Sequence, residues 1–417
     1  MPLRLEDTRS GERRTVRARP GQPLTMYVCG PTVYDNAHVG HARTYLFFDV
    51  VRRFLTAEGQ PVQHVMNVTD FEDKIDRRAA ELDLTWRGLA RREESAFFRD
   101  MGRFGVLLPH ARPRASDFAP QIVRVAESLE KTGRVRREGD LWIYSPPEHP
   151  DTVNFPTDSD LARHAVEEPD HPFPRREGAL GEFVIWKRQE PPLPSWESHW
   201  GRGTPGWHLE CYAMARRILD IPVDLHGGGL DLIYPHHHAE NEIALALDGQ
   251  PFSRMFVHTA FVLQDGAKMS KSTGNLISLR AALRLASPGG LRWYLLSTPY
   301  RVRLEWNVHA LQRADREYRT FRRLLARWLT PGRGGAIGAS RVEAVAEGAH
   351  ADLSEGLATD HVIERLREFS AQLGRDPSDR VASGERPAAL AALRAVEERL
   401  GLPLAPSATV RSGRRSR

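Results

Sequence analysis

Lysine is scarce in this 417-residue chain. Lysine and arginine together number 59, yet only five are lysines, and Lys268 and Lys271 stand three positions apart. Arginine is the ordinary cation elsewhere, so composition alone does not produce this pair. A compact ammonium makes a point contact with phosphate, whereas the planar guanidinium suits bidentate partners. The pair therefore indicates a site that requires lysine, such as one that binds a polyphosphate.

The residues around the two lysines have the composition of a loop. Asp265 and Gly266 precede them and are typical of a tight turn, and residues 272–275 read Ser-Thr-Gly-Asn. A loop of this kind can close over a phosphate chain. Taken alone, it also fits a solvated surface loop whose lysines have no role.

Cysteine is scarcer still, and long apolar runs are absent. The two cysteines are Cys29 and Cys211, and residues 1–20 are rich in arginine without an apolar core, unlike a secretory leader. We therefore expect a cytoplasmic location, where reducing conditions disfavour a disulfide between the two thiols. Two free thiols in that compartment are either inert core residues or ligands.

A strand, a turn and a helix are predicted near the N-terminus. The apolar run 24–28 ends at a Cys-Gly-Pro sequence, and apolar residues recur at helical spacing over 46–55. His38 and His41 then stand at the helix N-terminus, where free amides and the helix dipole favour an anion. Gly40 between them lets a ligand approach the backbone closely.

Together, His38 to His41 and Lys268 to Ser272 resemble the two nucleotide-binding motifs of the class I aminoacyl-tRNA synthetases. The resemblance implies activation of an amino acid by ATP bound with Mg²⁺. It gives catalytic roles to His38, His41, Lys268 and Lys271, which would stabilise the charge that develops on the α-phosphate and the leaving pyrophosphate. It also places Gly40 and Lys271 among the ATP-binding residues.

Four side chains form a candidate metal site. If a helix begins after Pro235, His236 and Glu240 are four positions apart and project from one face. With Cys29 and Cys211 they supply two thiolates, an imidazole and a carboxylate, which is a plausible zinc set.

This set resembles the amino-acid pocket of the cysteinyl-tRNA synthetase family, and the similarity runs from about residue 24 to about residue 306. In that family a zinc ion binds the thiol of the substrate cysteine. The family usually reads Pro-His-His-Glu-Asn-Glu, whereas this chain has two more residues there, so His238 and Glu242 form a second register. The spacing from the preceding glycine run favours His236 and Glu240.

The same resemblance implies further binding residues. For the substrate these are Trp207, Thr69 and Asp231, and for ATP they are Gly227, Gly228 and Gly229. The implied partners are ATP, L-cysteine and tRNA(Cys), with no membrane.

The expected fold class is α/β, with a doubly wound parallel-sheet nucleotide-binding domain split by an insertion and followed by a C-terminal helical bundle. The expected parts are a first catalytic half over 1–109, a connective insertion over 110–204, a second catalytic half over 205–306, a helical domain over 307–405 and a disordered basic tail over 406–417.

Arginines also follow one face of the first helix after residue 307: Arg313, Arg316, Arg323 and Arg327. Such a stripe is usually an ordinary solvated face, but with a net charge of +5 beside a synthetase-like core an RNA-backbone contact is about equally supported, and both interpretations stay open. Two other functions stay open. One is a ligase that transfers activated cysteine to an amino-sugar in mycothiol synthesis, and the other is an inactive relative that binds RNA or cysteine.

Overall fold

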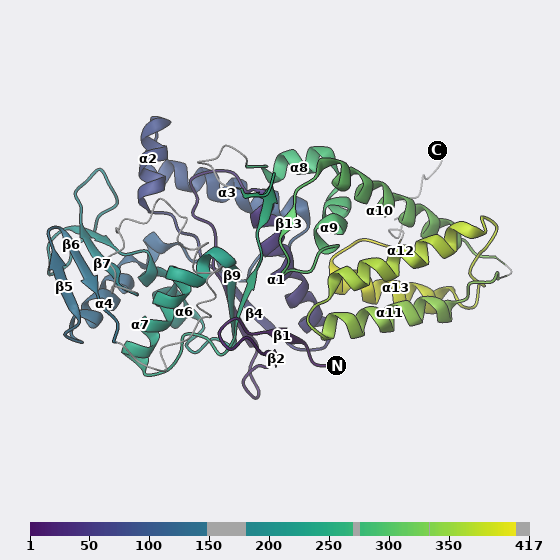
Figure 1. Cartoon of the computed structure of the whole chain (residues 1–417), viewed down its shortest axis with the longest axis horizontal. Helices are drawn as coiled ribbons and strands as arrows, with labels where there is room; N and C mark the ends of the chain where they lie inside the picture. The colour runs from purple at the N-terminus through teal and green to yellow at the C-terminus, as the bar shows by residue number, and fades with distance from the viewer. Residues whose placement is uncertain (148–180, 270–275, 333, 406–417) are drawn as a thin grey trace, which may run out of the picture. The chain divides into compact units, whose positions relative to one another are not determined.

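The structure is a computed structural model that describes residues 1–147, 181–269, 276–332 and 334–405. Two compact units form along the chain (Figure 1). The α/β unit consists of Pro2–Ala281 and Tyr300–Trp306, and the helical unit consists of Met1, Ala282–Pro299 and Asn307–Arg417. The predicted basic tail, residues 406–417, lies outside the described residues.

A parallel four-stranded sheet is the centre of the α/β unit. Its strand order is β10-β9-β3-β4, so strands from both ends of the unit's sequence are neighbours. All five residues of β3 are buried, as expected for a central parallel strand covered on both faces. The prediction of a doubly wound α/β fold is confirmed. The strands are β3 (Leu24–Val28), β4 (Val62–Met66), β9 (Leu225–Gly229) and β10 (Phe256–Thr259).

Helix α1 (Val39–Ala57) connects β3 to β4 and gives the predicted strand, turn and helix. His38 is its N-cap, because the His38 side chain accepts a hydrogen bond from the backbone N–H of His41. The apolar residues predicted over 46–55 are buried. The two arginines in this range, Arg52 and Arg53, are half-buried. Other helices in the described part of this unit are α2 (Asp73–Glu81), α3 (Trp86–Phe104), η1 (Ala115–Phe118), α4 (Ala119–Glu130), α6 (His208–Ile218), η2 (Leu230–Leu232), η3 (Ile233–His237) and α7 (His238–Asp248).

The predicted insertion contains an antiparallel sheet of order β5-β6-β7-β8. Its strands are β5 (Val135–Glu138), β6 (Leu141–Tyr144), β7 (Phe183–Arg188) and β8 (Gly203–Pro205). The last strand leads directly to α6 through Gly206, where an added Cβ would lie 1.9 Å from the carbonyl oxygen of Val184. Only glycine allows this approach, so the insertion fixes where α6 begins. Residues 148–180, the proline-rich part, lie outside the described residues.

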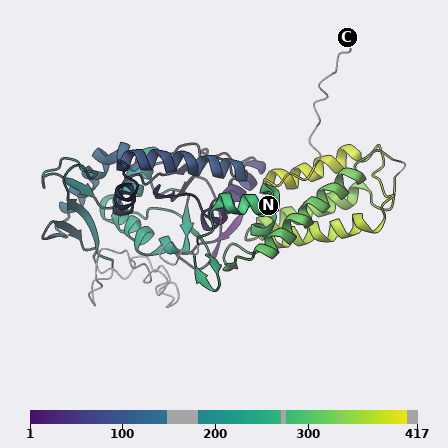
Figure 2. The ribbon, with the colours of Figure 1, turned by 90° about the horizontal axis from the view of Figure 1, so that it is seen from above.

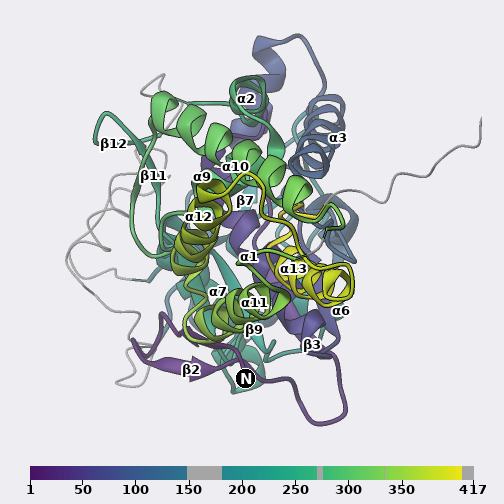
Figure 3. The same ribbon diagram turned by 90° about the vertical axis from the view of Figure 1, so that its right-hand side faces the viewer.

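A hairpin precedes the lysine pair. Strands β11 (Val262–Gln264) and β12 (Ala267–Lys268) are antiparallel, and Figure 3 shows both labelled beside each other. Asp265 and Gly266 have φ values of 53° and 75°, the left-handed conformation that a two-residue hairpin turn requires. The predicted turn is confirmed. The other short strands are β1 (Arg4–Glu6), β2 (Arg13–Thr15) and β13 (Leu304–Glu305).

The helical unit is a bundle whose helices run beside one another in Figure 2. In α10 one face is apolar and buried, with Tyr318, Phe321 and Leu325 among its residues. Two helices, α11 and α12, are separated by a turn in which Leu357 has a φ of 50°. The helices are α9 (Pro288–Leu296), α10 (Val308–Trp328), α11 (Ala339–Ser354), α12 (Thr359–Arg375) and α13 (Arg386–Leu400), while α8 (Leu279–Leu285) crosses the boundary between the units.

Candidate active site

Four buried side chains meet at the carboxyl end of β3. Cys29 follows that strand, Cys211 lies on α6, His236 lies on η3 and Glu240 lies in the first turn of α7. One ligand atom from each lies within 4.8 Å of every other. The sequence-predicted set is therefore assembled in one place.

The distances within the group suit one tetrahedral metal ion. The two Sγ atoms are 3.8 Å apart, Cys29 Sγ is 3.7 Å from Glu240 Oε1, and His236 Nε2 is 3.2 Å from the same oxygen. A tetrahedral ion with Zn–S bonds of about 2.3 Å separates two sulfurs by about 3.8 Å. Two sulfurs, one nitrogen and one oxygen are also a donor set that zinc accepts. The four side chains therefore fit a zinc ion.

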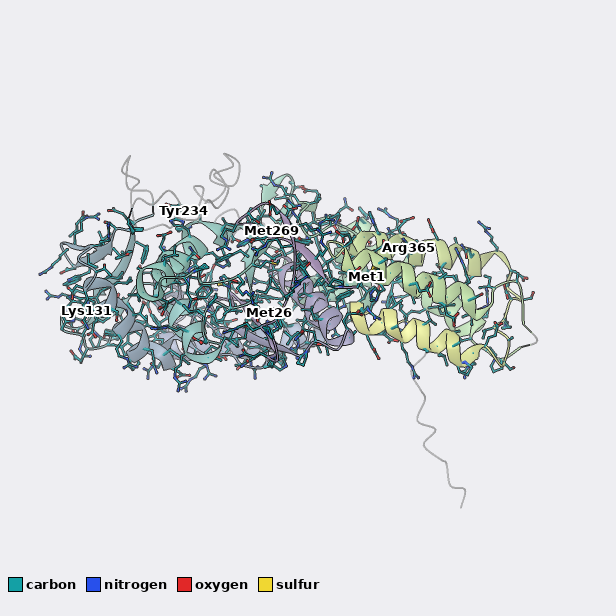
Figure 4. All side chains as sticks on the ribbon, turned by 90° about the horizontal axis from the view of Figure 1, so that it is seen from below. Met1, Met26, Lys131, Tyr234, Met269 and Arg365 are labelled. Carbon is teal, nitrogen blue, oxygen red and sulfur yellow. The ribbon has the colours of Figure 1, made fainter. Side chains whose placement is uncertain are left out.

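The polypeptide reaches this arrangement through an irregular helix start. Tyr234, labelled in Figure 4, has the non-helical angles φ −134° and ψ 134°, so the backbone is kinked there, just before the helical residues that lead into α7. The prediction of a helix after Pro235 is confirmed, because Tyr234 is the residue of 233–237 with non-helical angles and His237 leads directly into α7.

The alternative register does not reach the thiols. The His238 ring lies 5.6 Å from that of Tyr234, and the charge of Glu242 acts on Tyr144 of β6. Neither residue belongs to a group of candidate metal ligands among the described residues. Burial raises the pKa of Glu242 to about 7. The structure thus brings His236 and Glu240, and not the second pair, to the cysteines.

The pKa values of the four clustered side chains are strongly shifted. Burial raises the pKa of the Cys29 thiol, and its neighbours Cys211 and Glu240 raise it further. Burial opposes the charged forms of His236 and Glu240. It is outweighed by their mutual attraction together with the contacts of His236 with Cys211 and of Glu240 with His226 and His237, so the pKa of His236 is raised to about 10 and that of Glu240 lies well below its usual range. For Cys211, burial is outweighed by hydrogen bonds to Cys29 and His236, and its pKa is lowered to about 7. A metal ion must therefore displace protons to bind here.

Four more histidines surround the group, and the sequence did not single them out. His226 donates or accepts at two positions, with Nδ1 2.9 Å from the Tyr27 carbonyl oxygen and Nε2 2.7 Å from Glu240 Oε2. His208 Nδ1 lies 3.1 Å from His236 Nδ1, which leaves His236 Nε2 facing the cluster. The other two are His237 and His258. The only signals in the sequence were the position of His226 before the glycine run and the repeated histidines after Pro235.

The predicted substrate residues lie around the cluster. Trp207 stacks on the His236 ring, with centroids 4.1 Å apart and planes inclined by 15°. Thr69 is buried and donates to Glu210 Oε2 at 3.1 Å, a carboxyl whose pKa burial raises well above its usual value. Asp231 is half-buried, and its charge acts on the hydroxyl of Tyr45.

The first nucleotide motif forms the start of α1. The rings of His38 and His41 stack with centroids 3.7 Å apart, and His38 Nδ1 caps the helix. An added Cβ on Gly40 would lie 2.9 Å from the His38 ring, so glycine permits this cap. The arrangement leaves a helix N-terminus with two imidazoles, which is a suitable place for an anion.

The second motif is connected to the first through the backbone that follows it. The N–H of Val39 donates to the carbonyl oxygen of Ile277 at 3.0 Å, and the N–H of Leu279 donates to that of Ala37 at 2.8 Å. Residues 277–279, which follow the loop that contains the two lysines, therefore lie along the first motif. Lys268 ends β12, but its side chain and all of Lys271 lie outside the described residues.

Packing within the chain explains why β9 contains three glycines. An added Cβ on Gly227 would lie 2.3 Å from the carbonyl oxygen of Val257 and 2.4 Å from the Phe48 ring. An added Cβ on Gly228 would approach Leu232, and one on Gly229 would approach the carboxylate of Asp231. Close packing within the chain thus requires small residues here, while their role toward ATP stays a prediction.

The arginines of α10 divide into two groups. Arg316 and Arg323 are exposed and line a groove together with Arg319, Thr320, Arg322 and Ala326. Arg327 instead donates to carbonyl oxygens at the end of α12. The predicted stripe is therefore shorter than its spacing suggested, and Arg319 and Arg322 widen it. Across the described residues, no helix is long and apolar enough to span a membrane.

The sequence also matches known proteins. Residues 16–316 match the family model described as the tRNA synthetases class I (C) catalytic domain. The chain is 39% identical over 321 residues to a cysteine–tRNA ligase of Aeropyrum pernix, a match that spans 75% of this chain and 66% of the relative. It is 37% identical over 436 residues to a cysteine–tRNA ligase of an Anaeromyxobacter species (strain K), a match that spans 100% of this chain and 88% of the relative.

Solved structures share the fold at low sequence identity. A methionyl-tRNA synthetase of Mycobacterium tuberculosis in complex with methionyl-adenylate gives a TM-score of 0.62 at 16% identity, over 92% of this chain and 91% of the other. A leucyl-tRNA synthetase (LeuRS) of Agrobacterium radiobacter, in a ternary complex with tRNA, gives 0.65 at 11% identity, over 93% and 84%. At these identities the similarity establishes the fold.

Proposed function

The chain belongs to the family of class I (C) tRNA synthetases, and from this premise we propose that it activates cysteine with ATP and transfers the cysteinyl group to tRNA(Cys). The observation that carries the proposal is the four-donor group around Cys29 and Cys211, whose 3.8 Å sulfur separation suits a tetrahedral ion. A pocket built around two thiols and one metal is suited to recognising a third thiol.

Cys29, Cys211, His236 and Glu240 would hold the ion, which we infer is zinc. When bound, zinc would ligate the thiolate of the substrate cysteine, because it prefers a soft sulfur ligand to an alcohol. Packing alone separates such near-isosteres as cysteine and serine by only about 1–3 kcal/mol. Metal coordination therefore accounts for selectivity that shape cannot provide.

The substrate would be enclosed by residues that already surround the cluster. Trp207 stacks on His236 and forms a wall of the pocket, and Thr69 is fixed by its hydrogen bond to Glu210. Asp231 supplies a carboxylate for the substrate ammonium. These contacts would point the cysteine carboxylate away from the sulfur-binding end and toward the nucleotide.

The cysteine carboxylate would attack the α-phosphorus of Mg-ATP, forming cysteinyl-adenylate and releasing pyrophosphate. His38 and His41 at the N-terminus of α1 would stabilise the negative charge that grows on the phosphate oxygens. Lys268 and Lys271 would do the same from the second motif. Gly40 and the glycines of β9, Gly227 to Gly229, would also contact ATP through their backbone, in addition to the internal packing that requires their small size.

The 3′-terminal ribose of tRNA would then accept the cysteinyl group. The arginine-lined groove of α10 favours a polyanionic acceptor over an amino-sugar, because Arg316 and Arg323 are exposed cations on one face of the helix. As exposed cations they would contact the phosphates of the tRNA backbone.

Three measurements test the proposal on the same preparation. Cysteine-dependent exchange of pyrophosphate into ATP should proceed, and serine should not support it. Activated cysteine should then be transferred to tRNA(Cys) when tRNA and the amino-sugar acceptor are offered in parallel. Transfer to the amino-sugar alone would identify the other ligase, and absence of exchange would identify an inactive relative.

A further inference from the structure

A chain of hydrogen bonds runs from the N-terminal segment to the sulfur of Cys29. Thr8 Oγ1 lies 2.9 Å from His258 Nδ1, His258 Nε2 lies 2.8 Å from His237 Nδ1, and His237 Nε2 lies 3.3 Å from Cys29 Sγ. Both ring nitrogens of each histidine are therefore engaged. His237, His258 and Cys29 are buried, while Thr8 is half-buried.

The chain has a direction, because a neutral imidazole carries one N–H and one lone pair. Only one proton lies between His258 Nε2 and His237 Nδ1. Both rings are therefore protonated either on Nε2 or on Nδ1. If both carry the proton on Nε2, His237 donates to Cys29 and His258 accepts from the Thr8 hydroxyl. If both carry it on Nδ1, every bond reverses. Burial lowers the pKa of His258 to about 3, which keeps that ring neutral at neutral pH.

The state of Cys29 selects between the two directions. A cysteine that serves as a metal ligand is a thiolate, and a thiolate sulfur only accepts hydrogen bonds. The nitrogen of His237 that faces it must then carry the proton. The alternative direction would place two lone pairs against each other across 3.3 Å.

We propose that Thr8 is a positioning residue for the metal ligand Cys29. In the direction that the thiolate selects, its hydroxyl donates to His258 Nδ1, which stabilises the form in which both imidazoles carry the proton on Nε2 and the N–H of His237 faces the thiolate. This inference rests on the proposed function in one respect, namely that Cys29 binds a metal ion. Hydrogen bonds of this kind orient a ligand and adjust the charge on its donor atom.

The backbone holds Thr8 in the required place. Its N–H donates to the carbonyl oxygen of Phe256 at 2.7 Å, and the N–H of Phe256 donates to the buried carboxylate of Asp7 at 3.0 Å. Residues 7 and 8 are thus bound to the first residue of β10, the strand that carries His258. The segment before the nucleotide-binding sheet therefore contributes a side chain to the metal site.

Two substitutions at one position test the proposal. Thr8→Val keeps the shape of the side chain and removes the hydroxyl, while Thr8→Ser keeps the hydroxyl. In Thr8→Val we expect the Kd for Co²⁺ to rise about tenfold, the lower end of the effect of a ligand's hydrogen-bonding partner. The sulfur-to-cobalt charge-transfer band should shift, and the KM for cysteine should rise while the KM for ATP stays the same. Thr8→Ser should match the wild type in all four measurements.

A second comparison separates the hydrogen-bond chain from a general packing effect. In a protein that already carries His258→Phe, adding Thr8→Val should change the Co²⁺ affinity no further, because His258→Phe already breaks the chain of hydrogen bonds. Additive losses would overturn the proposal, as would a folded Thr8→Val protein with the wild-type spectrum and affinity. Thr8→Ala carries the same expectations if Thr8→Val does not fold.

Failure of the proposed function gives a different result. Wild-type protein that binds Co²⁺ through sulfur but forms no cysteinyl-adenylate would reject the proposed function, and the spectral comparison of the Thr8 variants would still decide the role of Thr8. Wild-type protein that shows no sulfur-to-cobalt band would overturn the assignment of Thr8 directly, since Cys29 would not be a metal ligand.

Discussion

The sulfur atoms of Cys29 and Cys211 lie 3.8 Å apart, although the two residues are 182 positions apart in the chain. These are the chain's only cysteines, and both are buried and free. The separation matches the edge of a tetrahedron around one zinc ion and is too long for a disulfide bond. The parallel pairing of β3 with β9 brings the two halves of the α/β unit together and makes this meeting possible.

The first prediction concerns metal content. Purified protein should hold about one zinc ion per chain, because the four donors suit a single tetrahedral site. Cys211→Ala should lose most of the metal, and Glu240→Ala should weaken cysteine binding more than Glu242→Ala does. Elemental analysis and cysteine titration measure both effects. Unchanged zinc in Cys211→Ala would contradict the ligand set, and a larger effect of Glu242→Ala would select the other register.

The second prediction uses the pH dependence of stability. Burial raises the pKa of Glu242 to about 7 from its ordinary 4.5. Between those values the folded chain holds this proton more tightly than the unfolded chain, so the contribution of Glu242 to stability falls as the pH rises through that window. Glu242→Gln removes the titration. Urea unfolding should show the variant more stable than the wild type at pH 8, with the advantage shrinking toward pH 4.5.

Glu242→Gln also has an internal control. Its zinc content should equal that of the wild type, since Glu242 lies outside the candidate ligand groups of the described residues. A difference in stability that does not vary with pH would mean that packing, rather than ionisation, distinguishes the two side chains.

The sequence predicted the elements whose signals are local. The apolar run before Cys29 became β3, the Asp265-Gly266 pair became a hairpin turn, and His38 became the cap of α1. Spacing within one helical turn also predicted that His236 and Glu240 would meet. Each of these depends on neighbours in the chain, so periodicity and turn chemistry suffice.

The surroundings of the metal site depend on tertiary contacts and could not be predicted. Thr8, His258 and His226 come from segments far apart in sequence, and only strand pairing places them around the cysteines. The kink at Tyr234 was likewise not predicted, because the local sequence pattern after it is that of a regular helix. Arg327 fitted the arginine stripe by spacing, but the end of α12 is its partner.

The third prediction concerns the lysine loop. Lys271→Ala should lower the rate of cysteinyl-adenylate formation by about 10²–10³, the usual cost of one preorganised donor, with little change in cysteine affinity. The reason is that the phosphate oxygens gain charge mainly in the transition state. Lys131→Ala, which removes a lysine from the end of α4, is the matched control and should leave the rate unchanged. Pyrophosphate exchange at the wild-type rate in Lys271→Ala would mean that the loop is structural.

The last prediction concerns the acceptor. Arg316 and Arg323 are exposed on α10, in the helical unit, whereas the nucleotide motifs belong to the α/β unit. Each phosphate contact releases counterions, so tRNA binding should weaken with salt at a log–log slope of up to about −0.9 per duplex contact. Reversing both arginines to glutamate should raise the KM for tRNA and flatten this slope, while adenylate formation stays near the wild-type rate.

The control for this charge reversal is a pair of exposed arginines on other helices of the same unit. Arg341→Glu with Arg394→Glu changes the net charge equally and leaves the groove of α10 intact. If the two double variants lose tRNA affinity to the same extent, net charge alone accounts for the effect. If the α10 variant keeps the wild-type salt dependence, the groove is not a tRNA-binding face. A specific loss in the α10 variant, with adenylate formation intact, is expected because phosphate contacts depend on where the cations lie and not only on their number.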